Sequence, residues 1–202
     1  CSAWVDFNNK FGNKDLGQIF EPAIELAEKG FPVSPITAYF WDLAAKKLLN
    51  KSLNGSQLLI NGNAPKPGQI FKNKGLAKTL KLIAKNGKEE FYQGEISKAI
   101  ISVISESGGC LGSVDLRNHT STWEEPIFIE FQGKRIWECP PNGQGLAALI
   151  ALNILKNFDI QNFPILSADR FHLEIEAMRL AFADAWFYVA DPTTNPAPLN
   201  EL

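Results

Sequence analysis

The chain has 202 residues, of which 45% are hydrophobic and 21% are charged, a composition that can bury a core and excludes wholesale disorder. Its 22 acidic and 20 basic side chains leave a formal net charge of -2, which argues against a dedicated nucleic-acid surface. We find no signal peptide and no apolar run long enough to span a bilayer, so the compartment stays unknown. Because the chain has no initiator methionine, we expect it to be processed or cut from a longer one.

Helices joined by short turns are predicted for the first part of the chain. Asp15–Lys29 has an apolar side and is followed by Gly30, which suits a left-handed C-terminal cap. Ser34-Pro35 predicts the start of a second helix, with serine as the N-cap and proline in the first turn. The expected apolar members of this helix are Tyr39, Phe40, Leu43, Leu48 and Leu49.

The helical pattern stops between Asn50 and Asn73, where Asn-Gly pairs, prolines and glycines predict a long surface loop. A short apolar patch lies within it at Leu58–Ile60. Helices are predicted again at Gly75–Lys85 and Gly94–Glu106, and Ser113 is expected to cap a short one.

A change to a period of two indicates a β-hairpin after the helices. Ile127, Ile129 and Phe131 alternate, and Gln132-Gly133-Lys134 separates them from a second run with Ile136 and Trp137. Phe128 points to the opposite side, so the first strand is apolar on both faces. Such strands are usually covered on both faces, which favours a layered α/β architecture with helices packed over a sheet.

Two further helices are expected toward the end of the chain. One runs from Leu146 to Asn157 and is rich in alanine and leucine. The other begins at Ser167, ends near Ala190 and is stopped by Asp191-Pro192. Its predicted apolar stripe consists of Phe171, Ile175, Met178, Phe182 and Ala185.

The one glycine-rich turn that leads from a strand into a helix is the motif to which we give most weight. It consists of Pro140, Pro141, Asn142, Gly143, Gln144 and Gly145. Backbone N–H groups at a helix start can hold an anion or an oxyanion, but glycines also permit a tight turn and close packing. The spacing fits neither a P-loop nor a complete G-x-G-x-x-G, which disfavours a nucleotide site.

No catalytic residue is assigned from the remaining candidates. His172 and Glu176 lie one helical turn apart and could be a base and its orienter, although a surface hydrogen bond is the more common reading. His119 has no partner nearby in sequence. Cys1 could use its own α-amino group as a base, but no strand is evident to hold it, and an arbitrary chain start is favoured.

Three cysteines without a C-x-x-C pair make a disulfide framework or a zinc site improbable. We therefore assign no metal site and no cofactor. Taken by themselves, the residues indicate an α/β domain and leave the activity open.

Several motifs in order resemble the gamma-glutamyltranspeptidase family along almost the whole chain. The segments that carry the resemblance are Glu21–Val33, Leu76–Gly94, Gly108–Leu116, Gly133–Gly145 with Leu152–Leu155, and His172–Pro192. Motifs in the right order over so much of the chain are more specific than one short pattern. Pro-Pro-Asn-Gly-Gln-Gly stands where the best-known members carry a Pro-Pro-Pro-Ser-Ser-Gly-Gly run, so the chain resembles a less characterised branch of the family.

The resemblance implies a part of the four-layer αββα N-terminal-nucleophile hydrolase sandwich, mostly helical, with a β-hairpin from the core sheet. Residues 1–202 would be a single partial domain from the later part of the large subunit, without the N-terminal portion and the small subunit. Members are made as a precursor that cuts itself, and the new N-terminal threonine of the small subunit attacks a gamma-glutamyl amide. The implied partners are that small subunit and a small gamma-glutamyl substrate, in a heterodimer or a dimer of heterodimers.

The resemblance places none of the chemical parts in this chain. The family's nucleophile would follow the stretch that corresponds to Leu202, and its carboxylate-binding arginine would precede Cys1. We therefore assign neither catalytic nor substrate-binding residues and expect this fragment alone to be inactive. Two alternatives stay open for the parent, namely a glutaryl-type amide acylase of the same fold and a non-catalytic binding or structural relative.

Overall fold

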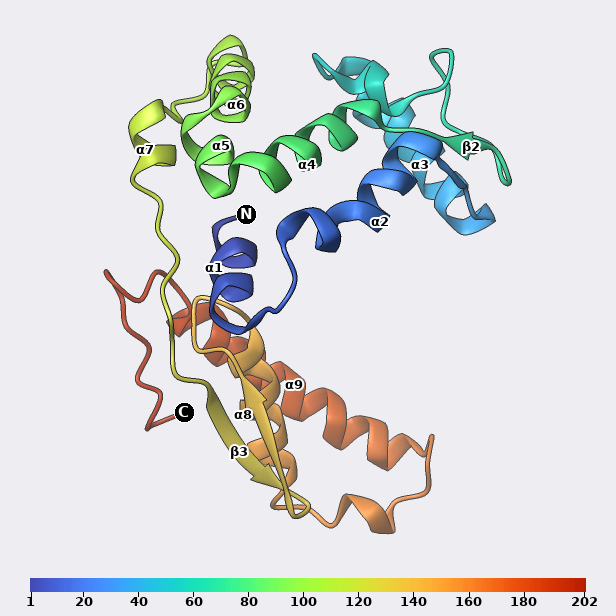
Figure 1. Ribbon diagram of the computed structural model, residues 1–202. Coiled ribbons are helices and arrows are strands. Elements are labelled where there is room, and N and C mark those ends of the chain that lie inside the picture. The colour runs from blue at the N-terminus through green and yellow to red at the C-terminus, as the bar shows by residue number, and fades with distance from the viewer. The chain divides into compact units, whose positions relative to one another are not determined.

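The computed structural model describes all 202 residues, which form two compact units, Cys1–Ser121 and Thr122–Leu202 (Figure 1). The first unit is mainly helical. Its helices and strands are α1 (Ser2–Phe11), α2 (Leu16–Lys29), β1 (Phe31–Pro32), α3 (Pro35–Lys47), β2 (Ile70–Phe71), α4 (Lys74–Asn86), α5 (Lys88–Gln93), α6 (Glu95–Glu106) and α7 (Ser113–Arg117).

The helix boundaries of this unit follow local chemistry. The Asp15 carboxylate accepts the Gln18 N–H at 2.9 Å at the start of α2, and Gly30 ends that helix with a φ of 91°. The Ser34 hydroxyl caps α3 in the same way by accepting the Thr37 N–H at 3.2 Å. The predicted helix limits at Asp15 and Gly30 and the predicted N-cap at Ser34 are confirmed, but Gly30 has a ψ of 169° and does not form the predicted left-handed cap.

The cap predicted at Ser113 is wrong by one residue. Gly112 is the N-cap of α7, and Ser113 is the first residue of the helix. The Asp115 carboxylate accepts the Gly112 N–H at 2.8 Å. A carboxylate three residues into the helix thus satisfies the N-cap amide, so no hydroxyl cap is needed.

The segment predicted as one long loop contains the short strand β2 and two 3₁₀ turns, Leu49–Lys51 and Gly55–Leu58. β2 pairs with β1 in antiparallel register, with Phe31 opposite Phe71 and Pro32 opposite Ile70. Val33, Ala38 and Phe71 form a small buried cluster beside this pair, with Trp41 and Ile60 packed against it. Strands of two residues are too short to show an alternation of apolar and polar residues, so the sequence does not predict this pairing.

Small residues of α3 face the interior, contrary to the prediction. Ala38 and Ala45 are buried, whereas the predicted apolar residues Tyr39, Phe40 and Leu48 are each more than 60% exposed. An apolar pattern shows which side of a helix avoids water but not which neighbour covers it. Here no element of the unit covers Tyr39, Phe40 or Leu48.

The second unit contains β3 (Ile127–Phe131), β4 (Lys134–Glu138), α8 (Gly145–Leu155), a 3₁₀ turn and α9 (Ala168–Tyr188). β3 and β4 form the predicted antiparallel hairpin, with Ile129 opposite Ile136. Its turn consists of Gln132 and Gly133, both with positive φ of 50° and 72°, as expected of a two-residue hairpin turn.

Helices cover only one face of this hairpin. Ile127 and Phe131 pack against the buried cluster that α8 and α9 form. On the opposite face Phe128 and Trp137 are 43% and 51% exposed, with ring centroids 4.4 Å apart. The two-sided cover expected from the sequence is therefore present on one side only within these residues.

Most of the stripe predicted for α9 is wrong, since only Ala185 is buried and Phe182 half-buried. The buried side chains of α9 are Ala177, Ala181 and Ala185, which recur every fourth residue, and Ala177 and Ala181 belong to one cluster with residues of α8. Phe171, Ile175 and Met178 are instead 39–55% exposed. Alanine lets two helices approach closely, which the bulkier stripe would prevent.

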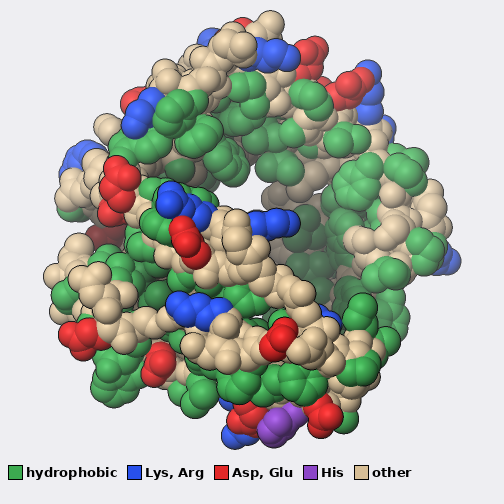
Figure 2. Space-filling model, turned by 90° about the horizontal axis from the view of Figure 1, so that it is seen from below, with side chains coloured by type: hydrophobic (Ala, Val, Ile, Leu, Met, Phe, Trp, Pro, Cys, Tyr) green, Lys and Arg blue, Asp and Glu red, His purple; other side chains and the backbone are tan.

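Much apolar surface remains exposed in both units. Figure 2 shows green hydrophobic side chains over large parts of the visible face. Ile165, Leu166, Trp186 and Phe187 are each more than 75% exposed. Large exposed apolar surfaces usually mark interaction surfaces. None of the helices has both the length and the apolar character required of a membrane span.

We predict that Ala181→Leu destabilises the packing of α8 on α9, because Ala181 is 0% exposed and has no space for three further carbons. Overpacking of this kind costs about 1–3 kcal/mol in the free energy of unfolding. The matched control is Ala183→Leu, which adds the same atoms on the exposed side of the same helix. Equal guanidinium unfolding midpoints for the two variants would contradict the packing described.

Candidate functional site

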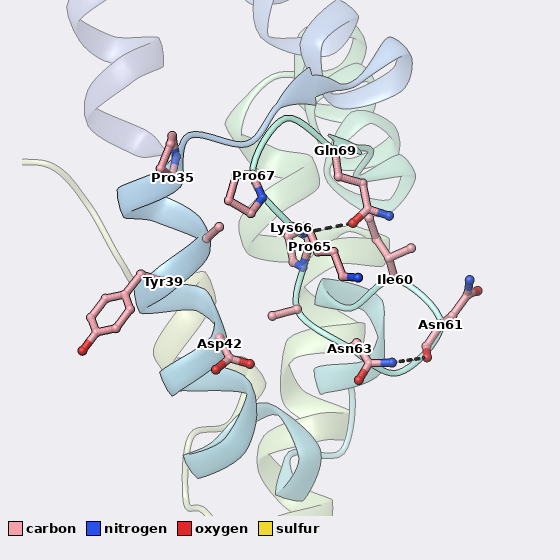
Figure 3. Close-up of a pocket in the computed structure, with 12 residues that line it drawn as sticks. Pro35, Tyr39, Asp42, Ile60, Asn61, Asn63, Pro65, Lys66, Pro67 and Gln69 are labelled. Carbon is pink, nitrogen blue, oxygen red and sulfur yellow. Dashed lines mark hydrogen bonds between the residues drawn. The ribbon is translucent and has the colours of Figure 1, made fainter.

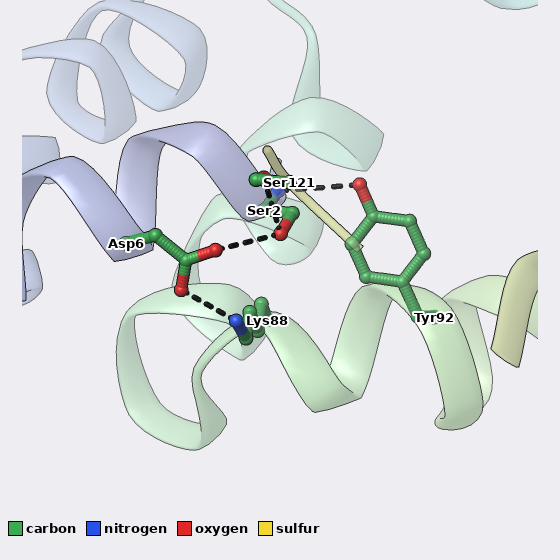
Figure 4. A network of polar contacts seen from close by, with 5 residues as sticks. All are labelled: Ser2, Asp6, Lys88, Tyr92 and Ser121. Carbon is green, nitrogen blue, oxygen red and sulfur yellow. Dashed lines mark hydrogen bonds and ion pairs between the residues drawn. The ribbon is translucent and has the colours of Figure 1, made fainter. Parts of the chain in front are cut away.

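The densest polar network of the first unit joins the start of α1 to α5 and to the segment after α7 (Figure 4). The Ser121 hydroxyl donates to the Ser2 hydroxyl at 2.7 Å, and Ser2 donates to Oδ2 of Asp6 at 2.9 Å. The Lys88 ammonium donates to Oδ1 of the same carboxylate. The Ser2 backbone N–H donates to the Tyr92 hydroxyl at 3.2 Å.

The electrostatics of this network do not activate Ser2 as a nucleophile. The hydrogen bond from Lys88, and after it the one from Ser2, lowers the pKa of Asp6 below the usual range of an aspartate. A carboxylate with a lowered pKa is a weak proton acceptor, so it cannot serve as an efficient general base. Ser2 is also only 2% exposed, which leaves no access for a substrate. The network therefore ties α1 to α5.

His119 lies next to this network but takes no part in its hydrogen bonds. Its ring stacks on Tyr92, with ring centroids 5.0 Å apart and an angle of 17° between the planes. The sequence showed no partner for His119 because the two residues belong to different elements. The aromatic pair Phe91-Tyr92 was a signal, but only the fold shows which ring meets the histidine.

The second histidine does not form the hypothesised pair. His172 is exposed on α9, and the Glu176 carboxylate instead accepts Nη1 of Arg179 at 2.6 Å. Arg170 pairs with Glu174 at 2.9 Å on the same helix. Because Glu176 pairs with Arg179 and makes no hydrogen bond with His172, neither the base-and-orienter interpretation nor the surface hydrogen bond between the two is confirmed.

The turn Pro140–Gly145 lies between the end of β4 and the start of α8. A Cβ atom at Gly145 would lie 2.5 Å from Oε2 of Glu138 and 2.9 Å from its Cβ. A Cβ at Gly143 would meet nothing within 4 Å. Close approach of β4 to the helix start therefore requires a glycine at position 145 but not at 143.

The Glu138 carboxylate is the anionic group next to the first residue of α8. The N-terminus of a helix carries a partial positive charge that favours a nearby carboxylate. A second anion at this place would be repelled by Glu138. The geometry thus supports close packing as the role of the turn and gives no support to an anion site.

The remaining candidates are dispersed. Cys1, Cys110 and Cys139 are all free thiols, and no group of three His, Cys, Asp or Glu side chains could hold a metal ion. Cys1 precedes the first turn of α1 directly, in a helical and not a strand context. The Asp191 carboxylate, whose pKa is lowered by hydrogen bonds from Thr193, closes the turn after α9.

A cavity of about 940 Å³ lies between α3 and the loop of residues 60–69 (Figure 3). Asp42 and Lys66 are the charged residues of its wall. The sequence does not reveal this cavity, because the turn residues of the loop predict an open surface.

Comparison with known proteins places these features in context. The family model for Gamma-glutamyltranspeptidase matches residues 1–202. The chain is 34% identical over 195 residues to a glutathione hydrolase proenzyme of Bacillus subtilis (strain 168), which covers 96% of this chain and 33% of that protein. The chain spans 33–38% of the length of the first curated relatives that it matches.

Two solved structures show the same fold. Cephalosporin acylase from Bacillus halodurans superposes with a TM-score of 0.88 at 37% identity, over 98% of this chain and 38% of that one. Helicobacter pylori gamma-glutamyltranspeptidase superposes with a TM-score of 0.89 at 29% identity, over 96% of this chain and 56% of that one. The predicted fold class, a part of the N-terminal-nucleophile hydrolase sandwich, is confirmed.

We predict that Lys88→Met makes the stability of the first unit less dependent on pH. The folded pKa of Asp6 lies below its unfolded value of about 3.9. The network therefore stabilises the fold above the unfolded pKa, and this contribution is lost as the pH falls through the folded pKa. The variant should have a lower urea midpoint than the parent at pH 6, with the difference shrinking toward pH 2.

The control for this experiment is Lys47→Met, which removes an exposed lysine in the last turn of α3. It should shift the midpoints at both pH values by the same small amount. A Lys88→Met variant with the same pH profile as the control would show that the Asp6 network does not stabilise the fold.

We predict that Gly145→Ala destabilises the second unit and that Gly143→Ala does not. The methyl group at 145 would collide with Glu138 at a cost of about 1–3 kcal/mol. The gain in helix propensity is smaller than the roughly 1 kcal/mol of a helix interior, because Gly145 is the first residue of α8. Thermal unfolding of the two variants measures the difference. A Gly145→Ala variant as stable as Gly143→Ala would exclude the close approach of Glu138.

Proposed function

Because this chain belongs to the gamma-glutamyltranspeptidase family, we propose that its parent protein cleaves gamma-glutamyl amide bonds and that residues 1–202 are scaffold from its large subunit. The observation that carries the proposal is that the family model matches the entire chain although the chain contains no activated nucleophile. Ser2 is bound to a carboxylate of lowered pKa, and neither histidine is hydrogen-bonded to a hydroxyl or thiol. The reacting groups of the parent are then supplied by other parts of its polypeptide.

The chemistry proposed for the parent follows from the family. A precursor cuts itself and frees the amino group of a threonine, whose hydroxyl attacks the gamma-glutamyl carbonyl. The threonine's own amino group takes the proton, the amine or amino acid leaves, and water or an acceptor amine resolves the glutamyl-enzyme. Both glutathione hydrolases and acylases among the relatives are named as proenzymes, which supports self-cleavage.

The partner proposed for this chain is the small subunit from the same precursor, in a heterodimer or a dimer of such heterodimers. The uncovered face of the hairpin and the exposed side of α9 support this proposal, because both carry large apolar side chains that need cover. We also propose that the two compact units belong to one partial domain, since a single family match runs through both.

The turn Pro140–Gly145 is proposed to have a structural role. It sets the distance between β4 and α8 through the contact of Glu138 with Gly145. It thereby fixes the hairpin on the helix that covers one of its faces. No catalytic or substrate-binding role is proposed for it.

A second candidate function is hydrolysis of glutaryl-type amides by the same fold. The likeness to the Bacillus halodurans acylase, at higher identity than to the Helicobacter pylori transpeptidase, favours this alternative. A third candidate is a parent without a nucleophile that binds other molecules. The residue that follows the predicted cleavage point distinguishes this third possibility, because a protein without a threonine there cannot react by the proposed route.

We predict that the full-length protein hydrolyses a gamma-glutamyl anilide faster than a glutaryl anilide. A glutaryl group lacks the α-amino group, and a site built to hydrogen-bond that amine rejects the analogue by a factor on the order of 10⁴ in kcat/KM. Residues 1–202 alone should turn over neither compound. Equal or faster glutaryl hydrolysis would favour the acylase, and turnover by the isolated chain would place the active centre within these residues.

A further inference from the structure

The cavity between α3 and the loop of residues 60–69 has the size of a small-molecule site. Its volume of about 940 Å³ lies at the upper end of the range for ligand pockets. Pro35, Pro65 and Pro67 stand along its wall, and Pro65 is among the most deeply buried side chains of the protein. Prolines restrict the backbone, so this wall loses little entropy when a ligand binds.

Backbone hydrogen bonds hold the loop side of the cavity in place. The Gly68 N–H donates to the Val33 carbonyl at 2.7 Å, and the Val33 N–H donates to the Gln69 carbonyl at 3.0 Å. The Gln69 side chain accepts the Lys66 N–H at 2.9 Å, as Figure 3 shows. Val33 itself is only 1% exposed. The cavity is therefore preformed in the protein without a ligand.

Opposite charges stand on the two walls. Asp42 extends from α3 toward the loop (Figure 3), and its Oδ2 accepts the Lys46 ammonium at 2.6 Å. Its second oxygen, Oδ1, accepts no hydrogen bond. Lys66 belongs to the loop and forms no ion pair with any carboxylate. Asp42 and Lys66 form no ion pair with each other, so Lys66 can bind an anionic group, and Oδ1 of Asp42 can accept a second cationic group beside Lys46.

The lining of the cavity offers the apolar and polar contacts that a peptide makes. Ala38, Ile60 and Ala64 provide apolar contacts, and the amide groups of Asn61 and Asn63 provide donors and acceptors. We propose that this cavity binds a short zwitterionic peptide, with its ammonium at Asp42 and its carboxylate at Lys66. Binding here is independent of the reaction that the parent catalyses.

The test uses the full-length protein, with triglycine as the probe and calorimetric titration as the measurement. Asp42→Asn and Lys66→Gln should each weaken triglycine binding about tenfold, because each removes one charge-assisted contact. Lys46→Gln is the matched control, since it breaks the same ion pair as Asp42→Asn but leaves the carboxylate in the cavity. It should bind triglycine at least as tightly as the parent.

Two further probes separate the ends of the peptide. N-acetyl triglycine should lose affinity for the parent and be insensitive to Asp42→Asn, and triglycine amide should show the same behaviour toward Lys66→Gln. Triglycine that binds elsewhere, including at a catalytic centre, binds all variants alike. Equal affinity of Asp42→Asn, Lys66→Gln and Lys46→Gln, or no saturable binding, would overturn the proposal, provided that the variants melt at the parent temperature.

Discussion

Close approach of helices through alanine is the constraint on which both units depend. Of the nineteen buried apolar residues, nine are alanines, among them Ala38, Ala77 and Ala181. Since a methyl group buries little area, each such contact contributes little through the hydrophobic effect alone. What alanine permits is a short distance between helix axes, so that neighbouring backbones and side chains make dense van der Waals contacts. The packing of α8 on α9 shows this most clearly.

The same constraint places the large apolar side chains outside. Trp4, Phe11 and Trp186 are 59–81% exposed, although such residues are normally buried on average. An isolated domain that buried its alanines and exposed its aromatic residues would be marginal, because most of the available apolar area would stay in water. This distribution is consistent with the proposed packing of these residues against further polypeptide.

The sequence predicted what local chemistry determines. Ser34 was identifiable as a cap, and Asp15 and Ser167 as helix starts, because such side chains bind amides three residues away. The hairpin turn at Gln132-Gly133 was equally local. The buried side of α9 was not predictable in this way, because a periodic pattern cannot show whether a large face meets α8 or an element outside these residues. Phe171 and Ile175 were predicted to face inward because they are large and apolar. The structure leaves them exposed and buries small alanines of the same helix instead.

For the candidate site, too, local patterns were predictable from the sequence and contacts between distant residues were not. Family motifs were identifiable from the sequence, yet the contacts of Ser2 with Tyr92 and Ser121 join residues 90 and 119 positions apart, which no local pattern reveals. Those contacts also explain why a buried serine beside an aspartate is inert here. A nucleophile needs a base whose affinity for protons is high, whereas Lys88 lowers the proton affinity of Asp6. The hydrogen bonds that join α1 to α5 also make the carboxylate a poor base. The charge distribution of this network therefore indicates a structural role.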